Sequence, residues 1–214
     1  MTDYDVVSFD IFDTLIERTV STPQKIFQIT GERVLGADKA VRFRKDRVSA
    51  ERKARILSAT GEVTLADIYR TLEGYDDSLP ELMAAEMAVE TECCKGRARG
   101  IRLYESAREK EKRVILVSDM YLSKDFLTGL LLRCGISGFD ALYVSCEKGC
   151  SKRTGMLYKH MLECENIAAG RVVHIGDDYK ADVKMSGCNG IDSVWLVNCK
   201  SLKSKLMQKF GLVL

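Results

Sequence analysis

Two acidic residues and a hydroxyl mark the end of the first apolar run of the chain. Asp10 closes the run at residues 6–10, and Asp13 and Thr14 follow within four positions. A carboxylate at a strand end, followed by a tight turn with a second acid and a hydroxyl, can bind a metal ion and attack an electrophile. A capped turn that simply leaves a strand would use the same residues, so this motif leaves both interpretations open.

Three further carboxylates lie close together later in the sequence. Asp177, Asp178 and Asp182 fall within six positions, directly after the apolar run at residues 172–175. Carboxylates this close repel one another and raise each other's pKa. A divalent cation removes that cost, and oxygen ligands suit Mg²⁺. The pattern favours a metal site over an acidic loop in which Asp182 caps a helix.

A hydroxyl and an amine occupy comparable places between these two motifs. Ser118 ends the apolar run at residues 114–118, where it could hold an oxygen of a phosphoryl group or cap the next helix. Lys152 lies near the start of a helix-like stretch, and Lys148 is a rival close by. A single lysine is usually a solvated side chain, so neither lysine identifies a site by itself.

Five short apolar runs should form the strands that position these residues. Each run is rich in Val, Ile or Leu, and helix-like stretches separate the last four. This alternation predicts an α/β fold with a parallel sheet covered on both faces. In such sheets the chemistry collects at the carboxyl ends of the strands. The expected strands are 6–10, 114–118, 142–145, 172–175 and 194–197.

About 100 residues separate the first two strands, and nearly all of them read as helix. Four of these helices should form an insertion over the end of the sheet, and a fifth should lead into the second strand. Thr64 is the expected cap of the third helix, with Asp67 at the fourth position. An amphipathic helix is expected at 201–214. The helices expected between the first two strands are 23–34, 38–59, 64–72, 79–94 and 101–112.

The composition fits one core domain with an insertion. The chain has 214 residues, 46% hydrophobic content and a net charge of +2 with basic residues spread out, which gives no support for nucleic acid or membrane as partner. No apolar run approaches the roughly 20 residues that span a bilayer, and the acidic N-terminus does not resemble a secretory signal. Eight cysteines without a CxxC pair predict reduced thiols and a cytoplasmic location.

The ordered set of Asp, Ser, Lys and an acidic cluster, each after its own strand, resembles the haloacid dehalogenase (HAD) superfamily. The resemblance implies a doubly wound, Rossmann-like parallel sheet with strand order 5-4-1-2-3 and a helical cap inserted after strand one. Residues 1–16 and 100–214 would form the core domain, and residues 17–99 the cap. The strings FDIFDTLIERTV, VSDMYLS, KRTGMLY and HIGDDYKADV are similar to HAD hydrolases found alone or fused to bacterial glycosyltransferases. A protein partner or a fused glycosyltransferase domain therefore stays open.

The resemblance also implies a mechanism for phosphate esters. Asp10 would attack phosphorus and form an aspartyl-phosphate, which water would then hydrolyse. Mg²⁺ would be held by Asp10, Asp177, the backbone carbonyl of Phe12, and Asp178 or Asp182 directly or through water. The metal would screen the repulsion between the anionic nucleophile and the phosphate.

The remaining roles implied by the resemblance concern the substrate. Ser118 would hold phosphoryl oxygens, and Lys152 would pair with Asp10 and the phosphate. Thr14 and Asp119, which belong to the first two motifs, are further candidates for substrate binding. Arg18 is a candidate because it lies just after the first motif, at the hinge into the cap.

One residue departs from the pattern of the family. Most HAD phosphatases carry a second Asp two positions after the nucleophile, which protonates the leaving alcohol and later activates water. Phe12 stands at that place here, and Asp13 lies one position further, where the family usually has Gly. Three explanations follow: Asp13 or a cap residue supplies the proton, the leaving group needs none, or the reaction is not phosphate-ester hydrolysis.

Substrate selection should reside in the cap, but the charged residues there allow two interpretations. Arg47, Glu51 and Arg55 are spaced to share one face of a long helix. That face could meet an anionic substrate, or it could be an exposed surface with Glu–Arg pairs. The same two interpretations apply to Glu86 and Glu90 on the fourth helix.

These observations favour a Mg²⁺-dependent phosphatase for a small soluble phosphate ester, such as a sugar phosphate or a nucleotide. Two alternatives remain. A metal-independent 2-haloacid dehalogenase would explain an aromatic residue at the Phe12 position, since a halide needs no proton. A non-catalytic HAD module associated with a glycan-building enzyme would explain it as well.

Overall fold

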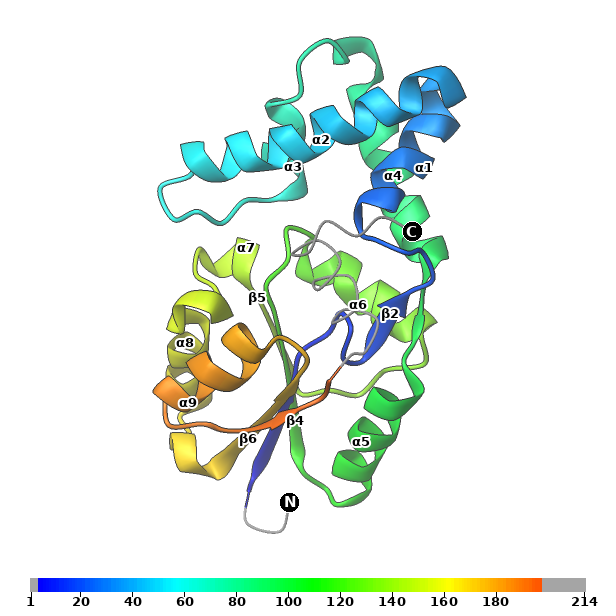
Figure 1. The fold of residues 1–214 in the computed structure, drawn as a ribbon. Helices are drawn as coiled ribbons and strands as arrows, with labels where there is room; N and C mark the ends of the chain where they lie inside the picture. The colour runs from blue at the N-terminus through cyan, green and yellow to red at the C-terminus, as the bar shows by residue number, and fades with distance from the viewer. Residues whose placement is uncertain (1–3, 198–214) are drawn as a thin grey trace.

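A five-stranded parallel sheet forms the centre of the protein in a computed structural model, which describes residues 4–197 (Figure 1). Its strand order is β5-β4-β1-β6-β7. Numbered within the core alone, this is the expected order 5-4-1-2-3 read from the other edge, so the fold prediction is confirmed. The strands are β1 (Val6–Phe9), β4 (Arg113–Ser118), β5 (Ala141–Val144), β6 (Val172–Gly176) and β7 (Asp192–Trp195).

The central position of β1 explains why distant motifs meet. β1 pairs in parallel with β4 on one side and β6 on the other, and Phe9 lies opposite both Leu116 and Ile175. The three strands therefore end at the same edge of the sheet. Asp10 is the next residue after β1, so it lies between the ends of the two strands that carry Ser118 and the acidic cluster.

Helices cover both faces of the sheet, as the alternating pattern predicts. The side chains of β1 alternate between two apolar clusters: Val7 packs with the α5 and α6 side, and Val6 with the α8 side. Figure 1 shows these helices on opposite sides of the sheet. The core helices and helical turns are α5 (Ala98–Glu109), α6 (Lys124–Arg133), α7 (Ser145–Lys148), η2 (Lys152–Thr154), α8 (Met156–Glu165), η3 (Ala169–Arg171), η4 (Tyr179–Lys184) and α9 (Met185–Cys188).

The inserted segment forms a separate helical layer at the top of Figure 1. Its third helix begins with the expected capping box: the Thr64 side chain accepts a hydrogen bond from the Asp67 N–H, and the Asp67 carboxylate accepts one from Thr64. The cap elements are α1 (Gln24–Leu35), α2 (Ala37–Leu57), α3 (Leu65–Arg70), the short turn η1 (Asp76–Ser78) and α4 (Leu79–Cys93).

A two-stranded antiparallel ribbon joins the cap to the core. It consists of β2 (Ile16–Arg18) and β3 (Cys94–Gly96), where the chain leaves the core and where it returns. The apolar pattern did not predict this ribbon, because strands of three residues are too short to show a period. The ribbon fixes where α1 starts and where α4 ends, and it carries Arg18.

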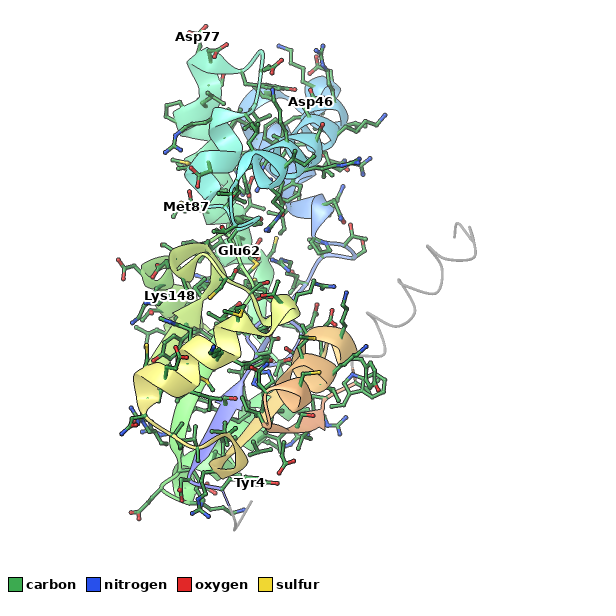
Figure 2. The ribbon with its side chains drawn as sticks, turned by 90° about the vertical axis from the view of Figure 1, so that its left-hand side faces the viewer. Tyr4, Asp46, Glu62, Asp77, Met87 and Lys148 are labelled. Atoms are coloured by element: carbon green, nitrogen blue, oxygen red, sulfur yellow. The ribbon has the colours of Figure 1, made fainter. Side chains whose placement is uncertain are left out.

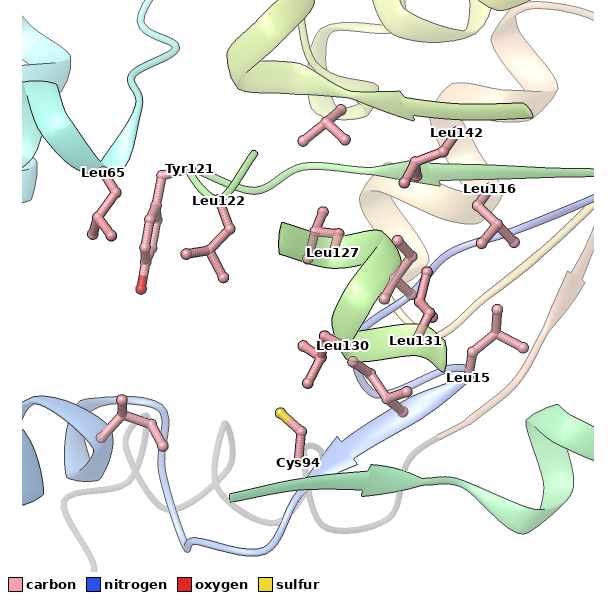
Figure 3. Packing of buried hydrophobic residues seen from close by; sticks show 14 of the residues in the cluster. Leu15, Leu65, Cys94, Leu116, Tyr121, Leu122, Leu127, Leu130, Leu131 and Leu142 are labelled. Atoms are coloured by element: carbon pink, nitrogen blue, oxygen red, sulfur yellow. The ribbon is translucent and has the colours of Figure 1, made fainter. Parts of the chain in front are cut away.

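The cap also contacts the loop that follows β4. The Leu65 N–H donates to the Tyr121 carbonyl at 2.8 Å, and Figure 3 shows Leu65 beside Tyr121 and Leu122. Figure 2 shows Glu62 and Met87 at the lower edge of the cap, above Lys148 of the core. The cap is thus anchored at the ribbon and at the loop after Ser118.

The long cap helix has the expected Glu–Arg pairs, since Glu51 forms ion pairs with Arg47 and Arg55, but Arg47 is not on an exposed face. Arg47 is fully buried, and its guanidinium forms two hydrogen bonds with the Glu86 carboxylate at 2.7 and 2.8 Å. Tyr69 and Tyr121 donate to the same carboxylate. Arg47 therefore stabilises the interior of the cap and is not part of an exposed basic face. Its partner Glu86 lies on α4, which sequence spacing within α2 cannot reveal.

Two further expectations concern the chain as a whole. In residues 4–197, no helix combines the length and the apolar character needed to cross a membrane. The seven cysteines in this part of the chain are all unpaired thiols, in agreement with the prediction of reduced thiols. The amphipathic helix expected at 201–214 lies outside the described residues.

Candidate active site

A buried lysine joins two carboxylates at the edge of the sheet. The Lys152 ammonium lies 2.5 Å from an Asp10 oxygen and 2.7 Å from an Asp182 oxygen. The Lys152 and Asp182 side chains are almost fully buried, and that of Asp10 is 11% exposed. The structure therefore brings together the nucleophile candidate, the lysine candidate and one member of the acidic cluster. Lys148, the rival lysine, ends the short helix α7.

The pKa values of Asp10, Asp182 and Lys152 are all shifted from their usual values. Burial raises the pKa of Asp10 to about 8, and the Asp182 and Asp177 carboxylates add to this effect against the attraction of Lys152. Burial also disfavours the charged form of Asp182, but Lys152 and His174 lower the pKa of its carboxyl well below the usual range. Asp10 and Asp182 raise the pKa of Lys152 well above its usual value, despite burial. The attraction of the Lys152 ammonium, together with His174, thus outweighs the effect of burial at Asp182, but Lys152 does not outweigh it at Asp10.

Three carboxylates are close enough to hold one cation. One oxygen each from Asp10, Asp177 and Asp182 lies within 4.8 Å of the other two. When all three are ionised, their three negative charges exceed the one positive charge of Lys152, whose ammonium contacts Asp10 and Asp182. Oxygen ligands and uncompensated negative charge of this size suit a divalent cation such as Mg²⁺. The residues present therefore fit the metal that the resemblance implies.

Asp178 caps a helical turn, unlike Asp177 and Asp182 of the same motif. One of its oxygens accepts hydrogen bonds from the Lys180 and Ala181 N–H groups, and the other lies 3.3 Å from Arg153. Its carboxylate thus caps the turn of η4, and it is not a member of the group of three. A role for Asp178 or for the Phe12 carbonyl at the metal stays a prediction.

Asp182 is held in place by residues that the sequence did not single out. His174 lies between Ser8 and Asp182, at 2.7 Å and 3.3 Å. Burial lowers the pKa of His174, so its ring is neutral. Because ionised Asp182 can only accept, the ring donates to Asp182 and accepts from the Ser8 hydroxyl. Gly176 completes the setting, since a side chain there would overlap Asp182.

Asp119 positions the lysine. Its two oxygens accept hydrogen bonds from the Lys152 N–H at 2.7 Å and the Arg153 N–H at 3.2 Å. Asp119 therefore fixes the turn η2 that carries Lys152, while its role as a substrate ligand stays a prediction. Ser118 is 2% exposed at the end of β4, and its hydroxyl makes no hydrogen bond within residues 4–197. This hydroxyl has its full capacity to bind an incoming group.

The turn after Asp10 is tight and contains an unusual backbone conformation. Asp13 has a φ of 60°, in the left-handed region where Gly is common and Asp is tolerated. This explains how Asp13 replaces the Gly that the family usually has. The Asp13 carbonyl accepts a hydrogen bond from Arg97. The Thr14 hydroxyl is fully buried and has no hydrogen-bond partner within the described residues, and its role in substrate binding stays a prediction.

Phe12 and Arg18 form a stacked pair where a general acid is usually found. The Arg18 guanidinium carbon lies 4.3 Å from the centre of the Phe12 ring. The Arg18 Nε–H donates to Glu90 of helix α4 at 2.7 Å, and the Glu90 side chain is 2% exposed. Arg18 therefore links the ring that follows the nucleophile to the cap. Asp13 does not belong to the group of three carboxylates around Lys152, and its role as the replacement acid stays a prediction.

A cleft opens between the cap and the core next to these residues. Its volume is about 760 Å³. Arg18 and the loop after Ser118 form the core side, and α1 and α2 form the cap side. The lining combines basic and apolar side chains: Arg18, Pro23, Gln24, Phe27, Val48, Glu51, Arg52, Arg55, Ile56, Met120 and Tyr121.

No family model and no curated protein matches this chain by sequence. The structure is nevertheless similar to that of the L-2-haloacid dehalogenase from Xanthobacter autotrophicus, with a TM-score of 0.64 and 15% identity over 96% of this chain and 83% of that chain. It is also similar to the HAD hydrolase YfnB from Bacillus subtilis bound to magnesium, with a TM-score of 0.62 and 17% identity over 98% and 99%.

A third similar structure is a 2-haloacid dehalogenase from Pseudomonas syringae, with a TM-score of 0.62 and 16% identity over 90% of this chain and 86% of that chain. At these identities the likeness concerns the fold, and it extends over the cap as well as the core. The parallel sheet, its strand order and the insertion after β1 agree with it. The protein therefore has the fold of the haloacid dehalogenase superfamily.

Proposed function

We propose that the protein is a Mg²⁺-dependent phosphatase that hydrolyses a small phosphate ester, such as a sugar phosphate or a nucleotide, through an aspartyl-phosphate on Asp10. The observation that carries the proposal is the cluster of Asp10, Asp177 and Asp182 around one lysine. A halide-releasing site needs no divalent cation, whereas three carboxylates gather here around one buried lysine. A divalent cation would balance their charge and would favour the ionised, nucleophilic form of Asp10.

In the first step, an Asp10 oxygen attacks phosphorus and the bond from phosphorus to the leaving oxygen breaks. Lys152 lies at hydrogen-bond distance from Asp10, so it can orient this carboxylate and attract a phosphoryl oxygen. The Ser118 hydroxyl is free to donate to another phosphoryl oxygen. Asp10, Asp177 and Asp182 would hold Mg²⁺, which supplies positive charge to the phosphoryl group when it is bound.

In the second step, water attacks phosphorus of the aspartyl-phosphate and restores the Asp10 carboxylate. His174 donates to one Asp182 oxygen and the Asp178 N–H to the other, which keeps this carboxylate oriented, while Ser8 holds the His174 ring. Asp119 keeps the Lys152 turn in place. Asp10, Lys152 and Asp182 are largely buried, and burial strengthens each of these electrostatic contacts.

A metal-independent 2-haloacid dehalogenase is the second candidate, and Phe12 is the observation that favours it. An aromatic ring at the position of the general acid suits a leaving group that needs no proton. In that reaction Asp10 would attack carbon, and halide would leave. Lys152 would then be the cation beside Asp10.

Activity measurements with and without EDTA separate the two candidates. We expect hydrolysis of phosphate compounds that requires Mg²⁺ and is lost in Asp10→Asn, with no halide release from 2-haloacids. A matched control is Asp192→Asn, because Asp192 is an exposed carboxylate on β7. Halide release that survives EDTA would establish the dehalogenase instead. Mg²⁺ binding without turnover of either substrate class would indicate a non-catalytic module.

A further inference from the structure

Arg18 is a mostly buried cation that does not use all of its hydrogen-bond donors. Its side chain is only 13% exposed, yet just one of its three nitrogens, Nε, forms a hydrogen bond to the described residues, with Glu90. The two terminal nitrogens are left over, and Arg18 lines the cleft between cap and core. A guanidinium has a planar fork of donors that matches phosphate oxygens. Glu90 and the Phe12 ring hold this fork in one orientation.

Arg18 lies beside the residue at which HAD phosphatases usually carry the acid that protonates the leaving group. Phe12, two positions after the nucleophile, carries the guanidinium on its face at 4.3 Å. Met120, two positions after Ser118, lines the same cleft. Arg18 thus links the residue two positions after the nucleophile to this cleft, which lies between the core and the cap helices α1 and α2. The position two residues after the nucleophile, where a general acid is usually found, therefore has a guanidinium beside it and no carboxylic acid. Glu51 is the carboxylate that lines the cleft, and it forms ion pairs with Arg47 and Arg55.

The positive charge of Arg18 and the absence of an acid at the Phe12 position both favour a leaving group that departs as a stable anion. A neutral alcohol must gain a proton as it departs, since an alkoxide is a very strong base, and a general acid is typically worth about 10²–10⁴-fold in rate. A phosphate leaves as a stable anion, because its second pKa is about 6. It needs no proton, and its new charge is stabilised by an adjacent guanidinium.

The rest of the cleft extends this argument to the remainder of the substrate. Arg52 lines it as well, is exposed, and has no ion-pair partner among residues 4–197, so a second cation is available. Phe27, Val48 and Ile56 give the cleft an apolar wall. A volume of about 760 Å³ lies within the usual range for organic ligands.

We infer that the substrate is an organic diphosphate, whose terminal phosphoryl group is transferred to Asp10 while Arg18 binds the phosphate that leaves. This inference rests on the proposed function and narrows its substrate class. The anhydride P–O bond breaks with its electron pair on the leaving organic monophosphate, and a P–O bond to Asp10 forms. Water then hydrolyses the aspartyl-phosphate to inorganic phosphate, and the proton released goes to solvent.

Three substrates with Mg²⁺ test the inference: adenosine diphosphate, adenosine monophosphate and 4-nitrophenyl phosphate. The two nucleotides share the organic part but leave as phosphate and alkoxide, respectively. We expect the kcat/KM of the diphosphate to exceed that of the monophosphate by at least about 10²-fold, the lower value for a missing general acid. Equal or faster hydrolysis of the monophosphate would overturn the inference and leave the phosphatase proposal intact. No hydrolysis of any of the three would overturn both.

Variants of Arg18 test its role separately. Arg18→Met alone would leave the buried Glu90 carboxylate uncompensated, so the double variant Arg18→Met/Glu90→Gln guards against misfolding. We expect either variant to lower kcat/KM for the diphosphate by roughly 10- to 100-fold, as for the loss of a charge-assisted hydrogen bond. Hydrolysis of 4-nitrophenyl phosphate should change less than about 3-fold, because its leaving group carries no second phosphate. An equal loss for both substrates would overturn the role of Arg18.

A matched control uses another Arg–Glu pair of the cap. Arg33 and Glu92 form a bidentate ion pair with a shortest distance of 2.7 Å between α1 and α4, but both are exposed and neither lines the cleft. Arg33→Met/Glu92→Gln should leave the kcat/KM of both substrates unchanged. A loss of diphosphate hydrolysis in this control as large as that in the Arg18 variants would attribute the effect to the cap as a whole and contradict the inference.

Discussion

Asp10→Asn should make the metal-free protein more stable, although it removes the nucleophile. Burial raises the pKa of the Asp10 carboxyl to about 8 in the folded protein, whereas an unfolded Asp has a pKa of about 4. Between these two values the unfolded chain releases a proton that the folded chain keeps. The free energy of unfolding therefore falls as the pH rises from about 4 to about 8. Asn carries no such proton and avoids this loss.

The size of the effect follows from the difference in pKa. One pKa unit corresponds to about 1.4 kcal/mol, so at pH 7 the titration of Asp10 lowers the free energy of unfolding by about 4 kcal/mol. At pH 4 the folded protein has a neutral carboxyl at this position, and Asn resembles it closely. Asp10→Asn should therefore match the parent protein at pH 4 and exceed its stability increasingly up to pH 8.

Urea unfolding in EDTA, followed by circular dichroism from pH 4 to pH 8, measures this difference. The variant should also gain less stability from added Mg²⁺ than the parent protein, because it lacks one of the three carboxylates. Asp192→Asn, at an exposed site on β7, serves as a control that should show no comparable trend. A destabilised Asp10→Asn, or a difference that does not depend on pH, would refute the charge balance assigned to the site.

Three further substitutions test how the site and the cap are held. Lys152→Met should destabilise the protein by about 3–5 kcal/mol in urea unfolding, because it leaves buried carboxylates without their cation; a loss below about 1 kcal/mol would contradict this. Arg47→Met should cost a similar amount since Glu86 is buried, and Arg47→Met/Glu86→Gln should recover much of the loss; equal losses would argue against a buried ion pair. Thr64→Ala should lower stability by about 1 kcal/mol through the lost capping box, and an unchanged midpoint of unfolding would disprove that contribution.

The sequence was sufficient for the fold because the strands are apolar and regularly separated. Four of the five strands in the sheet lie within one residue of their expected bounds, and the cap helices start and end close to theirs. The last strand, β7, begins two residues before its expected start. Strand order followed from the resemblance and not from the apolar pattern, because periodicity contains no information on which strands are neighbours.

The sequence was less informative about the roles of single acids and bases. Asp178 and Asp182 are both in the acidic motif, but only the structure shows that Asp178 caps a turn while Asp182 lies beside Asp10. His174 and Ser8 are on neighbouring strands, 166 positions apart, so their contact has no local signal. Arg47 was expected at a surface because its burial depends on Glu86, 39 positions away.

The central claim, that water attacks phosphorus of an aspartyl-phosphate on Asp10, is tested most directly by hydrolysis in water enriched in oxygen-18. After multiple turnovers with Mg²⁺ and a phosphate substrate, mass spectrometry should find the label in inorganic phosphate and none in the peptide that contains Asp10. Label in the Asp10 carboxylate would show that water attacks carbon of an ester intermediate, as in dehalogenation. That result would contradict hydrolysis through attack of water on phosphorus.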